Sequence, residues 1–540
     1  MKTTMRAVAY SLFLIGGVAA QSCTSFPVID LGYARHAPTQ TNQTALHNIS
    51  YATYANIRFA QPPVGDLRFR APQTPPPTSA GIQNGSYPRN ATDCLNSIPP
   101  YLAIAPGLEG VSWGSEDCLF LTVKVPEGIE GGNVPVVHWL YGGGYVFGSS
   151  NDWAGNPAAL FEDMAPDEKF IVVSSNYRLG ALGWMSSEGV DMTPNAGLWD
   201  ALVALQWTQN YISYFGGDPD RITVIGESAG AGMASHLLTL RGGNGTVPFN
   251  QAILTSPGYR PHVNRSADMT GIYHLFLNAT NCSDISCLRG LPTDATAAAN
   301  RDLLFNVPSS GWLGPLIGYG PIVDGDLVPD VPDRLLAQGK YHTSVEKVMT
   351  ANMARDGQYS TSSHATSWED FLPIFMTSPT QETIMTVNAT WSNLTGLALD
   401  TFAQDAIYAC HAFWIAQTWG VNAYRYSMSI PPANHGQDQF YYFHMEGAAA
   451  TAGPKASQIA RRMQKYFRTF ILEGRIGGGE CAGQNETGVA VPTHWPSYGM
   501  ELERWMNITE DGFQLVDGEA DQANRCQVLL DLIDDPRNGF

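Results

Sequence analysis

The segment that most constrains the fold is a short serine motif between a strand pattern and a helix pattern. The β-branched run at residues 222–225 is typical of a buried strand, and it leads directly into Gly226-Glu-Ser228-Ala-Gly230. Residues 231–240 then predict a helix. Strand, sharp turn and helix are the context in which a Gly-x-Ser-x-Gly sequence forms a nucleophile elbow. The motif therefore predicts an α/β architecture that exposes the Ser228 hydroxyl at the end of a strand.

Both glycines of this motif have a predicted steric role. The serine of an elbow lies in a strained turn, so Gly226 and Gly230 must lack side chains that would clash with the adjacent strand and helix. The helix N-terminus behind Ser228 favours developing negative charge. We therefore expect Ser228 to be a nucleophile.

A glycine triplet follows a second predicted strand, about 85 residues before Ser228. Residues 136–140 are apolar except for His138, and Gly142, Gly143 and Gly144 come shortly after them. Such a loop leaves backbone N–H groups free to point at one spot, which an oxyanion hole requires. A flexible turn is the alternative, but three glycines cost chain entropy that a plain turn seldom requires. We assign the oxyanion donors to the N–H groups of Gly143, Gly144 and Ala229.

Five segments together resemble the type-B carboxylesterase/lipase family, which also contains the cholinesterases and secreted fungal carboxylesterases. They are residues 58–69 (RFAQPPVGDLRF), 116–121 (EDCLFL), 176–183 (NYRLGALG), 215–219 (FGGDP) and the GESAG elbow. The resemblance covers nearly the whole chain after residue 20. It implies an α/β-hydrolase fold: a central, mostly parallel sheet with helices on both faces and a deep gorge leading to the serine. It also implies a serine carboxylic-ester hydrolase that acts on a small-molecule ester without a metal or organic cofactor.

The catalytic histidine is predicted by elimination together with this resemblance. In the fold the triad runs serine, acid, histidine along the chain, so histidines before Ser228 are excluded. His236 lies eight residues further along the predicted helix, ~12 Å of rise, and cannot reach the hydroxyl. His411 sits in an apolar helical stretch, and His444 lies in or beside an aromatic strand at 440–443, so both are interpreted as structural. His435, in a polar Asn-His-Gly-Gln-Asp loop similar to the family's His-Gly-x-acid loop, is the predicted base.

The acid of the triad has three candidates. Asp356 follows a predicted strand around 346–351 and lies 128 residues after the serine, in a segment that resembles the family's acid-Gly sequence. Relatives commonly carry Glu there, so the shorter Asp requires the loop to come closer. Asp324 and Asp326 are rivals, but their segment resembles a structural motif of the family. We predict Asp356.

The chain has eight cysteines, an even number that suits an oxidising compartment. The resemblance pairs Cys94 with Cys118 and Cys410 with Cys526, and Cys282 and Cys287 are expected to form a local bridge. Cys23 and Cys481 are left over. In lipase relatives the loop inside the first disulfide is a longer lid, so the shorter loop here favours an esterase over a lipase.

Two segments indicate the substrate preference through the same resemblance. Leu108 stands where cholinesterases place an aromatic residue that holds a cation by its π face, so a choline ester is not expected, although Trp113 is nearby. Pro315, Leu316 and Ile317 stand where cholinesterases have an aromatic acyl-pocket wall. These positions predict tolerance for medium acyl chains.

The N-terminus and the surface chemistry predict export. Residues 1–20 have a positive start, an apolar stretch and small residues before Gln21, which is typical of a cleaved signal peptide. No later apolar run is long enough for a membrane helix, so no stable membrane insertion is expected. Twelve Asn-x-Ser/Thr sequons make N-glycans an expectation. They lie at Asn42, Asn48, Asn84, Asn90, Asn244, Asn264, Asn278, Asn281, Asn388, Asn393, Asn485 and Asn507.

Net charge and motif spacing bound the remaining possibilities. A net charge of −19 without a Lys/Arg cluster excludes nucleic acid as a partner and favours solubility. Length alone suggests several domains, but the predicted site draws on residues from 57 to 435, so residues 21–540 are interpreted as one catalytic domain. No pattern specifies an oligomeric state. Two other functions are weighed: a lipase or sterol esterase acting at a lipid interface, and a non-catalytic adhesion protein on the same fold.

Overall fold

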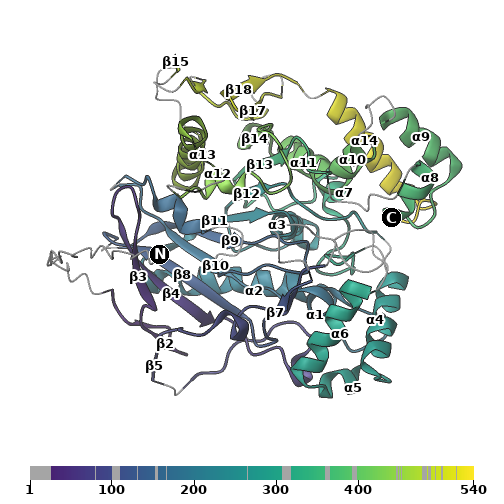
Figure 1. Cartoon of the computed structure of the whole chain (residues 1–540), viewed down its shortest axis with the longest axis horizontal. Helices are drawn as coiled ribbons and strands as arrows, with labels where there is room; N and C mark the ends of the chain where they lie inside the picture. The colour runs from purple at the N-terminus through teal and green to yellow at the C-terminus, as the bar shows by residue number, and fades with distance from the viewer. Residues whose placement is uncertain are drawn as a thin grey trace, which may run out of the picture.

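A single large sheet organises the computed structural model (Figure 1). The structure describes residues 26–78, 81–99, 110–129, 132–151, 156–165, 167–263, 266–306, 318–358, 365, 367–391, 398–445, 448, 451, 453–476, 483–484, 488–492, 494–499, 503–518 and 520–540. The predicted signal peptide, Cys23, Cys481, Leu108 and residues 315–317 lie outside these ranges.

The sheet has thirteen strands. In spatial order they are β15 (Gly483–Gln484), β16 (Ala490–Val491), β18 (Gly512–Val516), β17 (Trp505–Thr509), β14 (Ala423–Met428), β13 (Lys347–Met353), β12 (Gln251–Thr255), β11 (Gly217–Glu227), β9 (Val134–Leu140), β10 (Ile171–Ser175), β8 (Phe120–Pro126), β4 (Ser50–Arg58) and β3 (Gln40–Gln43). The central strands from β10 to β17 pair in parallel, and antiparallel pairs occur toward both edges. The predicted mostly parallel centre is confirmed.

Short strands outside this sheet are β1 (Ile29–Asp30), β2 (Arg35–His36), β5 (Ile82–Gln83), β6 (Asn96–Ser97) and β7 (Ser112–Trp113). The helices are α1 (Gly180–Trp184), α2 (Ala196–Tyr211), α3 (Ala229–Leu238), α4 (Ser266–Thr280), α5 (Ile285–Gly290), α6 (Thr293–Asn306), α7 (Pro332–Ala337), α8 (Trp368–Phe371), α9 (Gln381–Trp391), α10 (Ala398–Gln404), α11 (Cys410–Trp419), α12 (Gln439–Tyr442), α13 (Pro454–Glu473) and α14 (Ala520–Asp534).

The central strands are buried along most of their length because helices cover both faces of the sheet. In β9, six of the seven residues are buried, which is the pattern of a strand covered on both sides. Both α2 and α13 contact β9, and Figure 1 shows them on opposite sides of the central strands. The layered α/β-hydrolase architecture follows from this pattern.

The aromatic run at residues 440–443 is not the strand that the sequence suggested. It lies in and just after the short helix α12, whose Tyr442 ring stacks on Phe467 of α13 at 4.7 Å. A short apolar run does not distinguish strand from helix. Here β14 already pairs with β13 on one side and β17 on the other, so the sheet has no place beside β14 for another strand.

Three predicted disulfides are present: Cys94–Cys118, Cys282–Cys287 and Cys410–Cys526. The last one joins α11 to α14 within a second hydrophobic cluster that also contains Trp391 and Phe402. This cluster packs the chain's C-terminal helix against the helices that precede β14.

Segments that carry the family resemblance meet in space through ion pairs. Arg58 holds Asp117 with two hydrogen bonds of 2.6 and 2.9 Å. Arg68, which is 2% exposed, holds Glu116 in the same way at 2.6 and 2.7 Å. Paired guanidinium–carboxylate contacts fix orientation as well as distance. The two ion pairs therefore hold residues 58–69 against residues 116–121, which include Cys118 of the Cys94–Cys118 bridge.

Candidate active site

The three residues predicted as a triad follow neighbouring strands of the sheet. Ser228 comes directly after β11, Asp356 comes shortly after β13, and His435 lies in the loop after β14. Strands β11 to β14 are adjacent and parallel, so their carboxyl ends meet at one edge of the sheet. This edge is where open α/β sheets form their binding sites.

A continuous hydrogen-bonded chain joins the three side chains. The Nε2 atom of His435 lies 2.7 Å from the Ser228 hydroxyl oxygen, and its Nδ1 atom lies 2.8 Å from Asp356 Oδ1. Both contacts are within hydrogen-bond range. The structure thus brings together the three residues that the sequence predicted from segments up to 207 positions apart.

The Asp356 carboxylate is completely buried and held by further donors. The Ser256 hydroxyl lies 3.0 Å from both of its oxygens, and the Met353 amide donates to Oδ2 at 2.7 Å. The rival acids lie elsewhere. Asp324 accepts hydrogen bonds from the Asn195 side chain and from backbone amides, whereas Asp326 is exposed and pairs with Arg241.

Two of the excluded histidines, His236 and His411, make buried hydrogen bonds away from the triad. His236 is buried in α3, with Nδ1 2.7 Å from the Gly232 carbonyl oxygen. His411 is buried in α11, with Nδ1 2.9 Å from Asp333.

The backbone at Ser228 has the strained form expected of an elbow. Its φ and ψ are 53° and −124°, outside the regions that L-residues favour. A Cβ atom at Gly230 would overlap the carbonyl oxygen of Leu140 in β9, and one at Gly226 would lie 2.6 Å from the Ala231 amide nitrogen in α3. The predicted need for glycine on both sides of the serine is confirmed.

The glycine triplet packs against this elbow. A Cβ atom at Gly142 would lie 2.8 Å from Ser228 Cβ, so the loop and the serine are in direct contact. Gly143 and Gly144 have φ values of 110° and 59°, which suit glycine. Within the described ranges, the amides of Gly143, Gly144 and Ala229 donate no hydrogen bond. These three amides are therefore available as hydrogen-bond donors in the loop and the helix start that adjoin Ser228.

Two further carboxylates surround His435 and had no predicted role. Glu227, the variable residue of the elbow, has Oε1 3.5 Å from His435 Nε2, and burial raises its pKa to about 8. Asp438 accepts a hydrogen bond of 2.7 Å from the Tyr426 hydroxyl, and burial raises its pKa to about 7. Asp438 is the acid of the His-Gly-x-acid sequence, so the motif indicated its place but not its role.

Opposing influences set the pKa of His435. Burial lowers it, whereas the Asp356 hydrogen bond and the charges of Glu227, Asp356 and Asp438 raise it. The second group prevails, so the pKa lies above its ordinary value of 6.5. The imidazolium is therefore stabilised where a proton leaving Ser228 would be received.

Tyr408 packs its ring on the imidazole. The two ring centroids are 4.3 Å apart, and Tyr408 is 1% exposed. It belongs to a π-helical turn, residues Asp405–Ala409, directly before α11. Such turns are frequent at functional sites, but no sequence pattern marks this one.

Among the described residues, no group of three or more His, Cys, Asp or Glu side chains could hold a metal ion. The Trp113 indole donates a 3.0 Å hydrogen bond to Asp93. No helix in the described part of the chain is long and apolar enough to cross a membrane.

Known proteins are similar to this chain in sequence and in fold. The model of the carboxylesterase family matches residues 39–528. Carboxylesterase patB of Aspergillus clavatus is 30% identical over 96% of this chain and 98% of its own length. Lipase 1 of Geotrichum candidum is 33% identical over 54% of this chain and 57% of its own. The crystal structure of Aspergillus niger EstA superposes with a TM-score of 0.77 at 25% identity, covering 95% of this chain and 99% of that one. The chain belongs to the carboxylesterase family, and it is a carboxylic-ester hydrolase.

Proposed function

We propose that this enzyme hydrolyses short- to medium-chain carboxylic esters through an acyl-enzyme formed on Ser228. The observation that carries the proposal is the buried chain of contacts from the Ser228 hydroxyl through His435 to Asp356, at 2.7 and 2.8 Å. Nucleophile, base and orienting acid are then in place before a substrate binds.

The reaction proceeds in two halves. The Ser228 oxygen attacks the ester carbonyl while His435 Nε2 accepts its proton, and the same proton is then delivered to the departing alcohol. Asp356 fixes the tautomer through Nδ1 and stabilises the imidazolium. Water, deprotonated by His435, then attacks the acyl-enzyme, and Ser228 regains its proton as the carboxylic acid leaves.

Charge on the tetrahedral oxygen is stabilised by the N–H groups of Gly143, Gly144 and Ala229. Loss of one such donor costs ~3 kcal/mol in well-studied hydrolases. Ala229 is also the first residue of α3, so the partial positive charge of the helix N-terminus acts on the same oxygen.

The deciding experiment is p-nitrophenyl butyrate hydrolysis by purified enzyme, beside Ser228→Ala and wild type treated with an organophosphate. We expect both interventions to reduce the rate by at least ~10³-fold. Hydrolysis by folded Ser228→Ala at the wild-type rate would exclude Ser228 as the nucleophile.

Acyl-chain preference is tested separately. Across p-nitrophenyl esters from acetate to palmitate, we expect the highest kcat/KM with the short and medium acyl chains. Similarity to Lipase 1 of Geotrichum candidum makes a lipase the second candidate. A rate that jumps as a long-chain substrate passes its solubility limit would favour that candidate.

We further propose that the mature enzyme is one catalytic domain, begins near Gln21, and is secreted with N-glycans. Three disulfides support an oxidising destination. Among the sequon asparagines that the structure describes, seven are exposed: Asn48, Asn84, Asn90, Asn244, Asn278, Asn281 and Asn388. N-terminal sequencing and glycopeptide mapping of enzyme from culture medium test both points. An unprocessed N-terminus or unmodified sequons would contradict them.

A further inference from the structure

Tyr145 directly follows the glycine triplet and connects it to the segment behind the nucleophile. Its side chain is 2% exposed, and its hydroxyl donates a 2.6 Å hydrogen bond to the Gly258 carbonyl oxygen. The Gly258 amide in turn donates to the Ser228 carbonyl oxygen at 2.9 Å. Two hydrogen bonds therefore lead from the oxyanion loop, residues 142–145, to the backbone of the nucleophile.

The backbone of Tyr145 is fixed as well. Its carbonyl oxygen accepts a 2.8 Å hydrogen bond from the amide of Gly180, at the start of α1. Its φ is 65°, in the left-handed region that residues other than glycine seldom adopt. Such a conformation persists only where the surrounding contacts hold it. The hydroxyl and the carbonyl group of Tyr145 therefore hold the end of the oxyanion loop in a conformation that the free chain does not favour.

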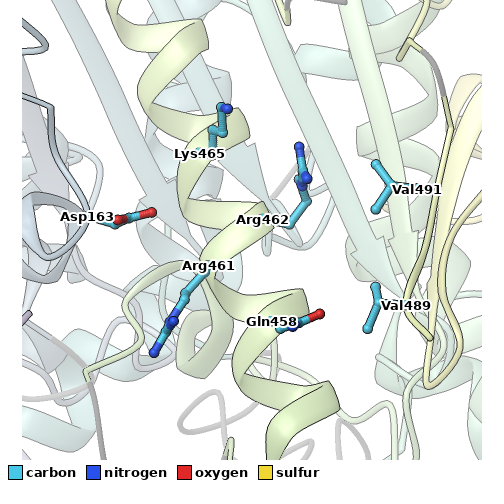
Figure 2. Close-up of a pocket in the computed structure, with 7 residues that line it drawn as sticks. All are labelled: Asp163, Gln458, Arg461, Arg462, Lys465, Val489 and Val491. Atoms are coloured by element: carbon cyan, nitrogen blue, oxygen red, sulfur yellow. The ribbon is translucent and has the colours of Figure 1, made fainter. Parts of the chain in front are cut away.

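The side chain of Tyr145 has little room to move. A Cβ atom at Gly232 would overlap both the Tyr145 hydroxyl and the Gly258 carbonyl oxygen, and one at Gly320 would lie 3.1 Å from the Tyr145 ring. The Trp184 ring packs edge-on against the same ring, with centroids 4.8 Å apart. The cavity of about 240 Å³ in Figure 2 lies beside α13, and Tyr145 is not among the residues that line it. Because a close-packed interior transmits displacements, a change at the hydroxyl should reach the oxyanion loop.

We propose that Tyr145 is a positioning residue for ester hydrolysis, whose hydroxyl holds the Gly143 and Gly144 amides where they bind the tetrahedral oxygen. This role rests on the oxyanion hole of the proposed function. Tyr145 acts through the oxyanion loop and not on the substrate, because its one hydroxyl proton is donated to Gly258. Burial raises the pKa of the phenol well above its ordinary value of 10, so the hydroxyl stays a donor across the pH range of hydrolysis.

Tyr145→Phe removes the hydroxyl and keeps the ring. For p-nitrophenyl butyrate we expect kcat to fall at least ~5-fold while KM changes less than ~2-fold, because the lost support acts on the transition state. A trifluoromethyl ketone forms a tetrahedral adduct with an active serine, so its inhibition constant should rise by the factor by which kcat/KM falls. The midpoint of the acid limb of the pH profile should not move, since the hydroxyl does not titrate there.

Gly232→Ala tests the same hydrogen bond while Tyr145 keeps its hydroxyl. The added Cβ atom pushes against both bonded oxygen atoms, so we expect the same fall in kcat with little change in KM. Titration of active sites with an organophosphate counts the reactive enzyme in each preparation, so unfolded protein is not counted as slow enzyme.

Tyr54→Phe is the matched control. Tyr54 is also 2% exposed and donates a 2.8 Å hydrogen bond to the Pro27 carbonyl oxygen, but it lies in β4, which three strands separate from β11. Full kcat per titrated site in Tyr145→Phe, a rise in KM in place of the fall in kcat, or an equal loss in Tyr54→Phe would overturn the role of Tyr145. Hydrolysis by Ser228→Ala at the wild-type rate would instead contradict the proposed function, whatever the Tyr145 variant shows.

Discussion

The Glu227 carboxylate lies 3.5 Å from His435 Nε2, the same nitrogen that contacts the Ser228 hydroxyl. The residue between the first glycine and the nucleophile thus reaches the base. Its negative charge is one of the influences that raise the pKa of His435.

Replacing Glu227 by Gln should leave the acid limb of the pH profile in place. The base must be neutral, so kcat/KM falls as pH drops through the His435 pKa. Below its own pKa of about 8, Glu227 is protonated, and Gln has nearly the same shape and the same charge. We therefore expect the midpoint of the acid limb for p-nitrophenyl butyrate to stay within about 0.3 unit of the wild-type value. Glu346→Gln, at an exposed position, is the control, and a midpoint lowered by about half a unit or more would mean that Glu227 is ionised there.

The same substitution should also make the free energy of unfolding depend less on pH. Burial raises the Glu227 pKa from 4.5 to about 8, so the folded chain holds this proton more tightly than the unfolded chain. Stability from this group is full below pH 4.5 and is lost as pH rises to about 8. Between pH 5 and pH 8, the free energy of unfolding of Glu227→Gln should fall by about 3–4 kcal/mol less than that of the wild type. Urea titrations at both pH values measure this, and equal pH dependence in both proteins would refute it.

Ser256→Ala should slow catalysis by leaving Asp356 with one donor fewer. A hydrogen bond to a charged group contributes about 1.5–3 kcal/mol, which corresponds to roughly a 10- to 100-fold loss in kcat. KM should change little, because Ser256 acts through Asp356 and not on the substrate. Ser235→Ala, a buried serine in α3 that bonds the Ala231 carbonyl, is the matched control. Similar kcat values in the two variants would contradict a positioning role for Ser256.

Substitutions at Tyr408 test whether its ring contact helps to position the His435 imidazole for catalysis. Tyr408→Leu removes an aromatic contact of about 0.5–1.5 kcal/mol, so kcat/KM should fall by roughly 2- to 10-fold. Tyr408→Phe keeps the ring and should retain most of the activity. If the two variants lose activity equally, the ring is not what positions His435.

Two of the disulfides close loops of very different length, so their contributions to the free energy of unfolding should differ. Cys410 and Cys526 are 116 residues apart, whereas Cys282 and Cys287 are 5 apart. In the chain-entropy model the long bridge contributes about 5 kcal/mol and the short one about 2 kcal/mol. Thermal unfolding of the two double Cys→Ala variants should show the larger loss for the long bridge. The reverse order would mean that packing around the bridges outweighs chain entropy.

The sequence predicted the triad because each member lies in a local pattern with a physical cause. Ser228 is marked by glycines that avoid backbone overlap, whereas His435 and Asp356 lie in loops that resemble those of the family. The same resemblance supplied the details of the fold and the pairing of Cys94 with Cys118 and of Cys410 with Cys526.

The supporting residues could not be predicted in the same way. Ser256 and Tyr408 reach the site only through tertiary packing, although Ser256 does carry one weak signal as a polar residue directly after β12. The helix at residues 439–442 was misassigned because its run is too short for periodicity, and the pairing of β14 on both sides decided its structure.

The contact between Ser228 and His435 joins positions that are 207 residues apart in the chain. These positions follow β11 and β14, the first and the last of four adjacent strands. A chain that has formed only its first half, or a fragment that ends before β14, contains the elbow without its base. Ester hydrolysis can therefore begin only when the centre of the sheet is complete. Because such distant contacts form late, the return of activity during refolding marks the final steps of assembly.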